Sequence, residues 1–319
     1  MGKVKLVHAV DKRIGGESRL SLAELVKGPK GVLPGNPACM GCPHNLGLKI
    51  LGRVLGDRAI LVVPAGCTSI ISGVYPREGI NMPIVHVPFA SAAAVASGLS
   101  RALKIAGKDG IVVVWSGDGG AADIGFATLS GAAVRDENIL VIVSDNEAYM
   151  NTGIQASGTT FWRARTTTTP IYGKTEERKD LALIMLVHRV PYVATASVGY
   201  PLDFAQKLKR AASIRGFKFI HLHSPCPPGW RFDPSKTIEV AKLAVETGAW
   251  ILWEYCSGKF TISPLSRPYM DKARRKPIKE YLRLQGRFAH LTDRDIEEIE
   301  RKVDEQCRFF LELEKILSK

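Results

Sequence analysis

Two short polar motifs follow apolar segments of the sequence and could together hold a charged cofactor. Asp118 lies in a glycine-rich turn after the apolar run 111–115, and Asn146 follows the apolar run 139–144. A carboxylate and an amide oxygen are hard ligands that suit Mg²⁺, which completes its coordination with phosphate oxygens and water. Glycines let the backbone approach a diphosphate, and the N-terminus of a following helix favours its charge. The glycines of this turn are Gly117, Gly119 and Gly120.

The distance between the two motifs supports this interpretation. Roughly 25 residues separate them, enough for one crossover helix and a returning strand, so the ends of two parallel strands would lie side by side. A tight turn whose aspartate merely caps a helix would explain Asp118, but not Asn146 at the matching distance. A dinucleotide-binding fold would use similar glycines, but the turn has no G-x-G-x-x-G motif.

The elements that must position these motifs alternate along the chain. Strands that are apolar throughout and separated by helices predict an α/β fold, with a parallel sheet covered by helices on both faces and ligands at the carboxyl ends of its strands. A long amphipathic helix is predicted near the C-terminus, after a basic, proline-containing segment (255–290) that we expect to wrap along a surface. Strands are predicted at 59–64, 111–115, 139–144, 192–197 and 217–223, and helices at 44–55, 89–106, 122–135, 179–188, 202–214 and 235–247.

A pair of cysteines precedes the first predicted helix. Cys39 and Cys42 form a Cys-x-x-Cys motif, which could bind a metal, form a disulfide or have no special role. The sequence starts without the apolar core of a secretion signal, so we expect a cytoplasmic protein. A disulfide is the least favoured interpretation, because that compartment is reducing.

Composition excludes several classes of protein. An apolar content of 45% with 24% charged residues is typical of a folded globular chain, and no apolar run is long enough to span a bilayer. The formal net charge is +13, yet no nucleic-acid-binding motif accompanies the basic residues. We therefore expect neither a membrane nor a nucleic-acid partner. The charge suits a solvated surface or, alternatively, the docking of an acidic protein.

The polar motifs resemble a known family of enzymes. The GDG turn followed by an Asn-containing turn is similar to the thiamine diphosphate motif. With DNEAYMNTG (145–153) and RTTTTP (165–170), it resembles the β subunit of pyruvate:ferredoxin oxidoreductase and related 2-oxoacid:ferredoxin oxidoreductases. The resemblance runs from about residue 37 to residue 254. It implies a pyrophosphate-type domain in which Mg²⁺ is bound by Asp118, Asn146 and the carbonyl of Ala148, in which Gly117, Gly119 and Gly120 meet the diphosphate, and in which Asn151 lies near the reacting carbon.

The same resemblance implies a [4Fe-4S] cluster held by four cysteines. Without the resemblance, the sequence offers four thiolates from three separated segments, a set that an iron-sulfur cluster uses and that zinc would also accept. The matching positions are Cys39, Cys42, Cys67 and Cys226. Cys256 and Cys307 match nothing in the family pattern. Pro43 follows the second cysteine where many relatives have glycine, which limits what can be carried over about the substrate pocket.

The activity implied by the resemblance is oxidative decarboxylation of a 2-oxoacid. Coenzyme A would accept the acyl group and ferredoxin the electrons. An α subunit would supply the glutamate that activates the thiamine cofactor, and γ and ferredoxin-like δ subunits, or a fusion of them, would complete the complex. Pyruvate is the expected substrate, with branched-chain 2-oxoacids and oxalate as alternatives.

Two other classes remain open from the residues alone. A non-redox thiamine decarboxylase would need the GDG region but would have no use for the four cysteines. A non-enzymatic scaffold with structural zinc would need the cysteines alone. Three regions are predicted: an N-terminal extension (1–36), a cofactor-binding α/β domain (37–254), and a C-terminal basic arm with an amphipathic helix (255–319).

Overall fold

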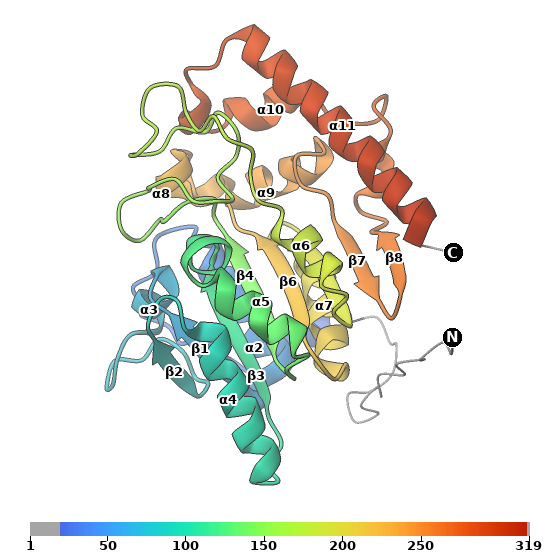
Figure 1. The fold of residues 1–319 in the computed structure, drawn as a ribbon. Helices are drawn as coiled ribbons and strands as arrows, with labels where there is room; N and C mark the ends of the chain where they lie inside the picture. The colour runs from blue at the N-terminus through green and yellow to red at the C-terminus, as the bar shows by residue number, and fades with distance from the viewer. Residues whose placement is uncertain (1–19, 318–319) are drawn as a thin grey trace.

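The central strands are apolar along their length because helices cover both faces of the sheet. The computed structural model describes residues 20–317 and shows an eight-stranded, mostly parallel sheet between two helical layers (Figure 1). Successive strand residues alternate between two buried clusters, as strand geometry requires. The α/β fold predicted from the sequence is confirmed. The predicted strands correspond to β1 (Ala59–Pro64), β3 (Ile111–Gly117), β4 (Leu140–Asp145), β5 (Tyr192–Ser197) and β6 (Lys218–His223).

The strand order places the two polar motifs on neighbouring strands. The order across the sheet is β2-β1-β3-β4-β6-β5-β7-β8, where β2 is Ile84–Val87, β7 is Trp253–Cys256 and β8 is Lys259–Ile262. Strands β3 and β4 are parallel, with Gly117 opposite Ser144, and β4 and β6 are parallel, with Asp145 opposite His223. The crossover predicted from the spacing of the motifs is therefore confirmed. The carboxyl ends of the parallel strands β1, β3, β4 and β6 lie together along one side of the sheet, which we call the carboxyl edge.

Two layers of helices enclose the sheet. One buried cluster joins the sheet to α4, α5 and α6, and the other joins it to α1, α2 and α7. The 13-residue α2 packs against α7, and Gly47 brings α2 close to the indole ring of Trp115 on β3. The bounds are α1 (Leu22–Lys27), α2 (Pro43–Leu55), α4 (Ala92–Ile105), α5 (Phe126–Val134), α6 (Leu181–Val187) and α7 (Pro201–Ser213).

Several short elements were not predicted. Strand β2 (Ile84–Val87) forms one edge of the sheet, and α3 (Cys67–Ser72) follows β1. At the other edge, β7 (Trp253–Cys256) pairs antiparallel with β5, and β8 (Lys259–Ile262) pairs antiparallel with β7. The predicted boundary after residue 254 falls inside β7. The predicted N-terminal extension (1–36) lies largely outside the described residues, because the description begins at residue 20.

Helices α8 to α10 and the start of α11 lie over the end of the sheet shown at the top of Figure 1, and α11 continues along the side that carries β8. The predicted amphipathic helix is α11 (Asp293–Leu317), which packs against β8. We expected the segment 255–290 to wrap along a surface. The structure corrects this, because Ile278, Tyr281 and Phe288 are buried in the core. The remaining bounds are α8 (Pro227–Trp230), α9 (Thr237–Glu246) and α10 (Ile278–Arg283), and short helical turns at Gly56–Arg58, Gly120–Ile124, Pro234–Lys236, Arg267–Met270 and Gly286–Phe288.

Candidate functional site

The loop after β4 is folded so that its polar groups face the end of β3. The Asp145 side chain accepts a hydrogen bond from the backbone N–H of Glu147 (2.8 Å), and the Thr160 hydroxyl donates to the Glu147 carbonyl (2.6 Å). Glu147 has a left-handed backbone (φ 60°), which is uncommon for a residue with a side chain and is found at functional sites. Asn146 and Ala148, on either side of it, are both buried.

Three oxygen atoms converge between the ends of β3 and β4. The amide oxygen of Asn146 lies 3.0 Å from the carbonyl oxygen of Ala148 and 3.1 Å from Oδ1 of Asp118. In this orientation of the amide, an ionised Asp118 supplies no hydrogen to lie between these acceptors, so the Asn146 oxygen is repelled by both neighbours unless a cation binds them. A separation of about 3 Å is the edge of an octahedron whose metal–oxygen distance is about 2.1 Å. The donor set therefore fits Mg²⁺.

His44, with its proton on Nδ1, can hold the amide in the orientation that a metal ion requires; with its proton on Nε2 it would suit the reversed amide equally well. Its Nε2 lies 2.9 Å from the Asn146 amide nitrogen, and its Nδ1 lies 3.3 Å from the Thr68 hydroxyl. Burial lowers the pKa of His44 to about 4, so the ring is neutral near pH 7. With its proton on Nδ1, the ring accepts the amide N–H at Nε2. The reversed amide would donate to Asp118 and Ala148 and would leave no place for a metal ion.

The carboxylates at this edge of the sheet need a positive partner. Burial, and then the charge of Asp145, raise the pKa of Asp118 well above its usual value. Burial and the charge of Glu147 raise the pKa of Asp145 to about 7. The Thr159 hydroxyl lies 3.0 Å from Asp118 and 2.9 Å from Asp145, so one hydrogen serves two carboxylates. A bound divalent cation would favour the ionised form of Asp118 and offset this repulsion.

The glycines of the turn after β3 have different roles. A Cβ on Gly119 would lie 2.5 Å from the ring of Tyr149, and one on Gly120 would lie 2.8 Å from the Ser116 hydroxyl, so both glycines permit close packing. A Cβ on Gly117 would meet nothing within 4 Å. Gly117 is therefore the glycine that borders open space, where a phosphate group could approach.

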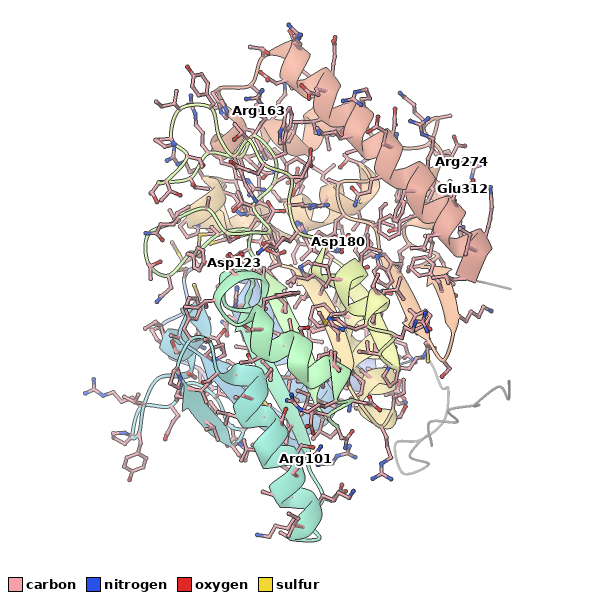
Figure 2. The ribbon with its side chains drawn as sticks, viewed as in Figure 1. Arg101, Asp123, Arg163, Asp180, Arg274 and Glu312 are labelled. Atoms are coloured by element: carbon pink, nitrogen blue, oxygen red, sulfur yellow. The ribbon has the colours of Figure 1, made fainter. Side chains whose placement is uncertain are left out.

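Tyr149 is held in place by a second acidic residue. Its hydroxyl donates to Asp123 (2.8 Å), which also accepts from the Gly158 N–H (2.9 Å) and pairs with Lys179 (2.8 Å). Figure 2 shows Asp123 above the start of α5, on the side of the loops. The ring of Tyr149 packs edge-on against Phe89 at 6.0 Å. These contacts fix one wall of the space in front of the GDG turn.

A cleft opens between these groups and one of the four predicted cluster cysteines. Its volume is about 530 Å³, large enough for the reactive part of a cofactor and a small substrate. Asn151, the predicted catalytic residue, also lines it and is exposed. The remaining lining comes from four separate segments and includes Ala65, Gly66, Cys67, Phe89, Gly117, Asp118, Asn146, Met150 and Thr152.

The four cysteines predicted to bind a cluster lie within electrostatic reach of one another. Burial raises the pKa of Cys226 to about 12, and the charges of Cys67, Cys42 and Cys39 add to the shift. Burial likewise raises the pKa of Cys67 to about 12, with Cys42, Cys39 and Asp118 contributing. The ionised forms of Cys42, Cys67 and Cys226 are disfavoured by burial and by neighbouring sulfurs, which fits a centre whose iron ions supply positive charge.

Local structure also prepares these sulfurs to bind. Cys42 immediately precedes α2, Cys67 begins α3, and Cys226 immediately precedes α8. Backbone N–H groups of residues 44 and 45 donate to the Cys42 sulfur, and that of Gly229 donates to the Cys226 sulfur. Such hydrogen bonds stabilise thiolate ligands. Within residues 20–317, no three His, Cys, Asp or Glu side chains gather tightly enough to hold a single metal ion.

Comparison with known proteins decides the family. Residues 64–222 match the family described as the C-terminal TPP-binding domain of thiamine pyrophosphate enzymes. Pyruvate synthase subunit PorB of Methanothermobacter marburgensis is 48% identical over 280 residues, which cover 86% of this chain and 95% of that protein. The chain belongs to the PorB/VorB family. It is thus a β-type subunit of a 2-oxoacid:ferredoxin oxidoreductase with a thiamine diphosphate-binding domain, as the sequence predicted.

Other PorB/VorB relatives differ in the substrate that they are named for. Ketoisovalerate oxidoreductase subunit VorB of Pyrococcus abyssi is 46% identical over 282 residues, covering 85% of this chain and 89% of that protein. A solved 2-oxoglutarate:ferredoxin oxidoreductase from Magnetococcus marinus, with 2-oxoglutarate, coenzyme A and succinyl-CoA bound, matches with a TM-score of 0.55 and 27% identity, over 66% of this chain and 79% of that one.

Sequence reasoning missed several residues that shape the site of this PorB/VorB chain. Thr159 comes from an irregular loop and carries no recognisable motif, while Glu147 is paired by an arginine 140 residues away in the sequence. His44 follows the Cys-x-x-Cys motif by two positions, so a hydrogen bond near the cysteines could be expected of it, but its contact with Asn146 could not. None of the described helices is long and apolar enough to cross a membrane.

Proposed function

We propose that this subunit carries the reaction centre for the oxidative decarboxylation of a 2-oxoacid, with Mg²⁺-bound thiamine diphosphate and a [4Fe-4S] cluster in adjoining sites. The convergence of the oxygens of Asp118, Asn146 and Ala148 carries the proposal, because with the amide oxygen of Asn146 facing the other two the arrangement is unfavourable without a cation. Thiamine diphosphate supplies a nucleophilic carbon and an electron sink for the loss of carbon dioxide. A [4Fe-4S] cluster supplies a one-electron acceptor.

The residues of the chain divide this work. Asp118, Asn146 and the Ala148 carbonyl would bind the metal ion, and His44 holds the Asn146 amide in the binding orientation. Gly117 would let the diphosphate approach the backbone, and Gly119 and Gly120 admit the rings of Tyr149 and Phe89, which exclude water from the cleft wall. Asn151 would contact the substrate from the cleft lining. The cluster would be bound by Cys39, Cys42, Cys67 and Cys226.

Partner subunits would complete the centre. We propose an α subunit that supplies the activating glutamate, with γ and ferredoxin-like δ subunits, or a fusion of them, carrying electrons to ferredoxin. Coenzyme A would accept the acyl group, and the complex would work in the cytoplasm. We also retain the proposed division into regions 1–36, 37–254 and 255–319. Alone, this chain should be inactive.

Pyruvate is the first candidate substrate, and a branched-chain 2-oxoacid is the second. Support for pyruvate comes from the PorB relatives, of which one is 48% identical, and support for the second from a VorB relative at 46%. The test is an acceptor-linked assay of the assembled complex with pyruvate, 2-oxoisovalerate, 2-oxoglutarate and oxalate. Pyruvate should have the highest kcat/KM, and a higher value for 2-oxoisovalerate would assign the second function instead.

Anaerobic purification tests the cofactors independently of the substrate. The measurement is made on this subunit after its separation from the others, because a ferredoxin-like subunit would bring iron of its own. We expect a brown subunit that is bleached by dithionite and contains about four irons together with thiamine diphosphate and Mg²⁺. A colourless subunit that binds thiamine diphosphate would indicate a non-redox decarboxylase, and zinc without thiamine diphosphate would indicate a scaffold. Either result would overturn the proposal.

A further inference from the structure

Glu147 lies between two proposed metal ligands yet points away from the cleft lining. Asn146 and Ala148 are its neighbours in the chain. The Glu147 backbone is left-handed, and its side chain is 1% exposed. Neither carboxylate oxygen has an aligned hydrogen bond among residues 20–317. A buried carboxylate of this kind is costly unless a cation compensates it. The identity of that cation therefore bears on the conformation of the whole loop.

The compensating cation comes from the C-terminal third of the chain. Nη1 of Arg287 lies 2.6 Å from Oε2 of Glu147, and the Arg287 side chain is 3% exposed. Arg178 is farther away, at 3.8 Å from Oε1. Arg287 belongs to the helical turn Gly286–Phe288, which precedes α11. An element distant in the sequence thus balances the charge within the proposed metal loop.

Arg287 also reaches this loop by a second route. Its guanidinium carbon lies 3.5 Å from the ring centroid of Trp230, and the Trp230 indole N–H donates to the backbone carbonyl of Asn146 (2.8 Å). Trp230 ends α8, which begins directly after Cys226. One arginine therefore contacts the side chain of Glu147 and the ring that fixes the Asn146 backbone. A simple core ion pair would need the first contact alone.

The backbone around Arg287 is fixed against the same region. The Gly286 N–H donates to the Arg231 carbonyl (3.0 Å), and the Arg165 N–H donates to the Arg287 carbonyl (3.1 Å). A Cβ on Gly286 would lie 2.8 Å from Cβ of Arg231, so glycine is required for this close approach. The guanidinium itself donates from Nε to the side-chain oxygen of Gln285 (2.9 Å), so both the backbone and the side chain of this residue are held in place, as positioning of other groups requires.

We infer that Arg287 is a positioning residue for the metal loop, holding Asn146 and Ala148 so that their oxygens face Asp118. The C-terminal region is then part of the cofactor site rather than an appendage. Arg287 touches neither the reacting atoms nor the metal ligands' oxygens, and it acts through Glu147 and Trp230. The inference rests on the proposed function, because it requires a metal ion at Asp118.

The chain contains a matched control for this inference. Arg275 is another buried arginine of the C-terminal region; it pairs with Asp304 and donates to the Cys307 sulfur (2.9 Å). Neither partner lines the cleft. Loss of either arginine would leave a carboxylate without its closest cation, so both variants should lower the melting temperature. The inference predicts that Arg287 alone affects metal affinity.

The experiment measures Mn²⁺ binding to the assembled complex by electron paramagnetic resonance, with thiamine diphosphate present. Arg287→Met should weaken Mn²⁺ binding about tenfold or more, as loss of groups that orient metal ligands commonly does, whereas Arg275→Met should change it less than twofold. Arg287→Lys, which keeps the charge but loses the planar stack on Trp230, should lie between wild type and Arg287→Met. It also provides the readout if Arg287→Met does not assemble.

The outcomes separate the two claims. Equal Mn²⁺ affinities for the Arg275→Met, Arg287→Lys and Arg287→Met complexes would show that Arg287 is merely structural and would overturn the inference. Asp118→Asn tests the underlying site, because it removes a proposed ligand. If Asp118→Asn leaves Mn²⁺ affinity unchanged, the metal site itself is wrong, and the role of Arg287 falls with it.

Discussion

The Nε2 atom of His44 lies 2.9 Å from the side-chain nitrogen of Asn146. This contact joins the loop of the Cys-x-x-Cys motif to the loop after β4. When the neutral ring carries its proton on Nδ1, it accepts the amide N–H, and the amide oxygen then points at Asp118 and Ala148. The orientation of one amide group thus decides whether this edge of the sheet attracts or repels a cation.

Loss of the His44 ring nitrogen should weaken metal binding without removing a ligand. In His44→Phe, the Asn146 amide is free to reverse and to donate to Asp118. We expect Mg²⁺ affinity to fall about tenfold, measured by titration of the complex with Mn²⁺. Thr68→Val is the control, since it removes the partner of Nδ1 and leaves Nε2 in place. An unchanged affinity in His44→Phe would contradict this role.

Gly119 should not tolerate even a methyl group. Its Cβ in Gly119→Ala would lie 2.5 Å from the Tyr149 ring and would displace the wall of the cleft. We expect a loss of stability of about 1–3 kcal/mol from overpacking and weaker binding of thiamine diphosphate, measured by calorimetry. The matched substitution is Gly98→Ala in α4, where a Cβ meets nothing within 4 Å. That variant should be neutral or more stable by up to about 1 kcal/mol.

Lys218 should make the protein more stable as pH rises. Burial lowers its pKa from 10.5 to about 7 in the folded chain, where its amine donates to Asn138 (2.9 Å). Between pH 7 and 10.5 the unfolded chain holds a proton that the folded chain has lost, so this residue's contribution to stability improves with pH. The slope is at most about 1.4 kcal/mol per pH unit.

Comparison with Lys218→Met isolates this effect from other titrating groups. The Asn138 oxygen keeps a donor in the variant, because the Gly216 N–H also reaches it (3.2 Å). Denaturant unfolding should show that the variant is more stable than wild type at pH 7 and that this advantage shrinks by pH 10. An advantage that grows with pH would contradict the predicted sign.

Two buried cysteines should differ in their effect on iron content. Cys226 is a proposed cluster ligand, while Cys307 lies against Arg275, away from the cleft. Cys226→Ala should lose the cluster and electron transfer but keep thiamine diphosphate binding. Cys307→Ala should keep all three, with iron counted after anaerobic purification. Turnover with an external acceptor in Cys226→Ala would remove this cysteine from the ligand set.

The sequence allowed the strand-end residues to be predicted, but not the groups that hold them in place. Asp118 and Asn146 follow apolar strands at a spacing that parallel topology explains, so both could be placed at one edge of the sheet. Thr159 could not, since its loop has no periodicity. The pairing of Glu147 with Arg287 depends on tertiary packing across 140 residues, which no local pattern encodes. The antiparallel strands β7 and β8 have four residues each, too short for a clear alternation.

The crowding of Asp118, Asp145 and Glu147 has a consequence for the life of the protein in the cell. A ligand that binds the folded state alone stabilises it by mass action. Newly made subunits that lack the proposed divalent ion and the thiamine diphosphate bound with it should therefore unfold more often and be degraded sooner than loaded ones. Thiamine starvation should consequently reduce the abundance of this polypeptide, and not merely its catalytic rate.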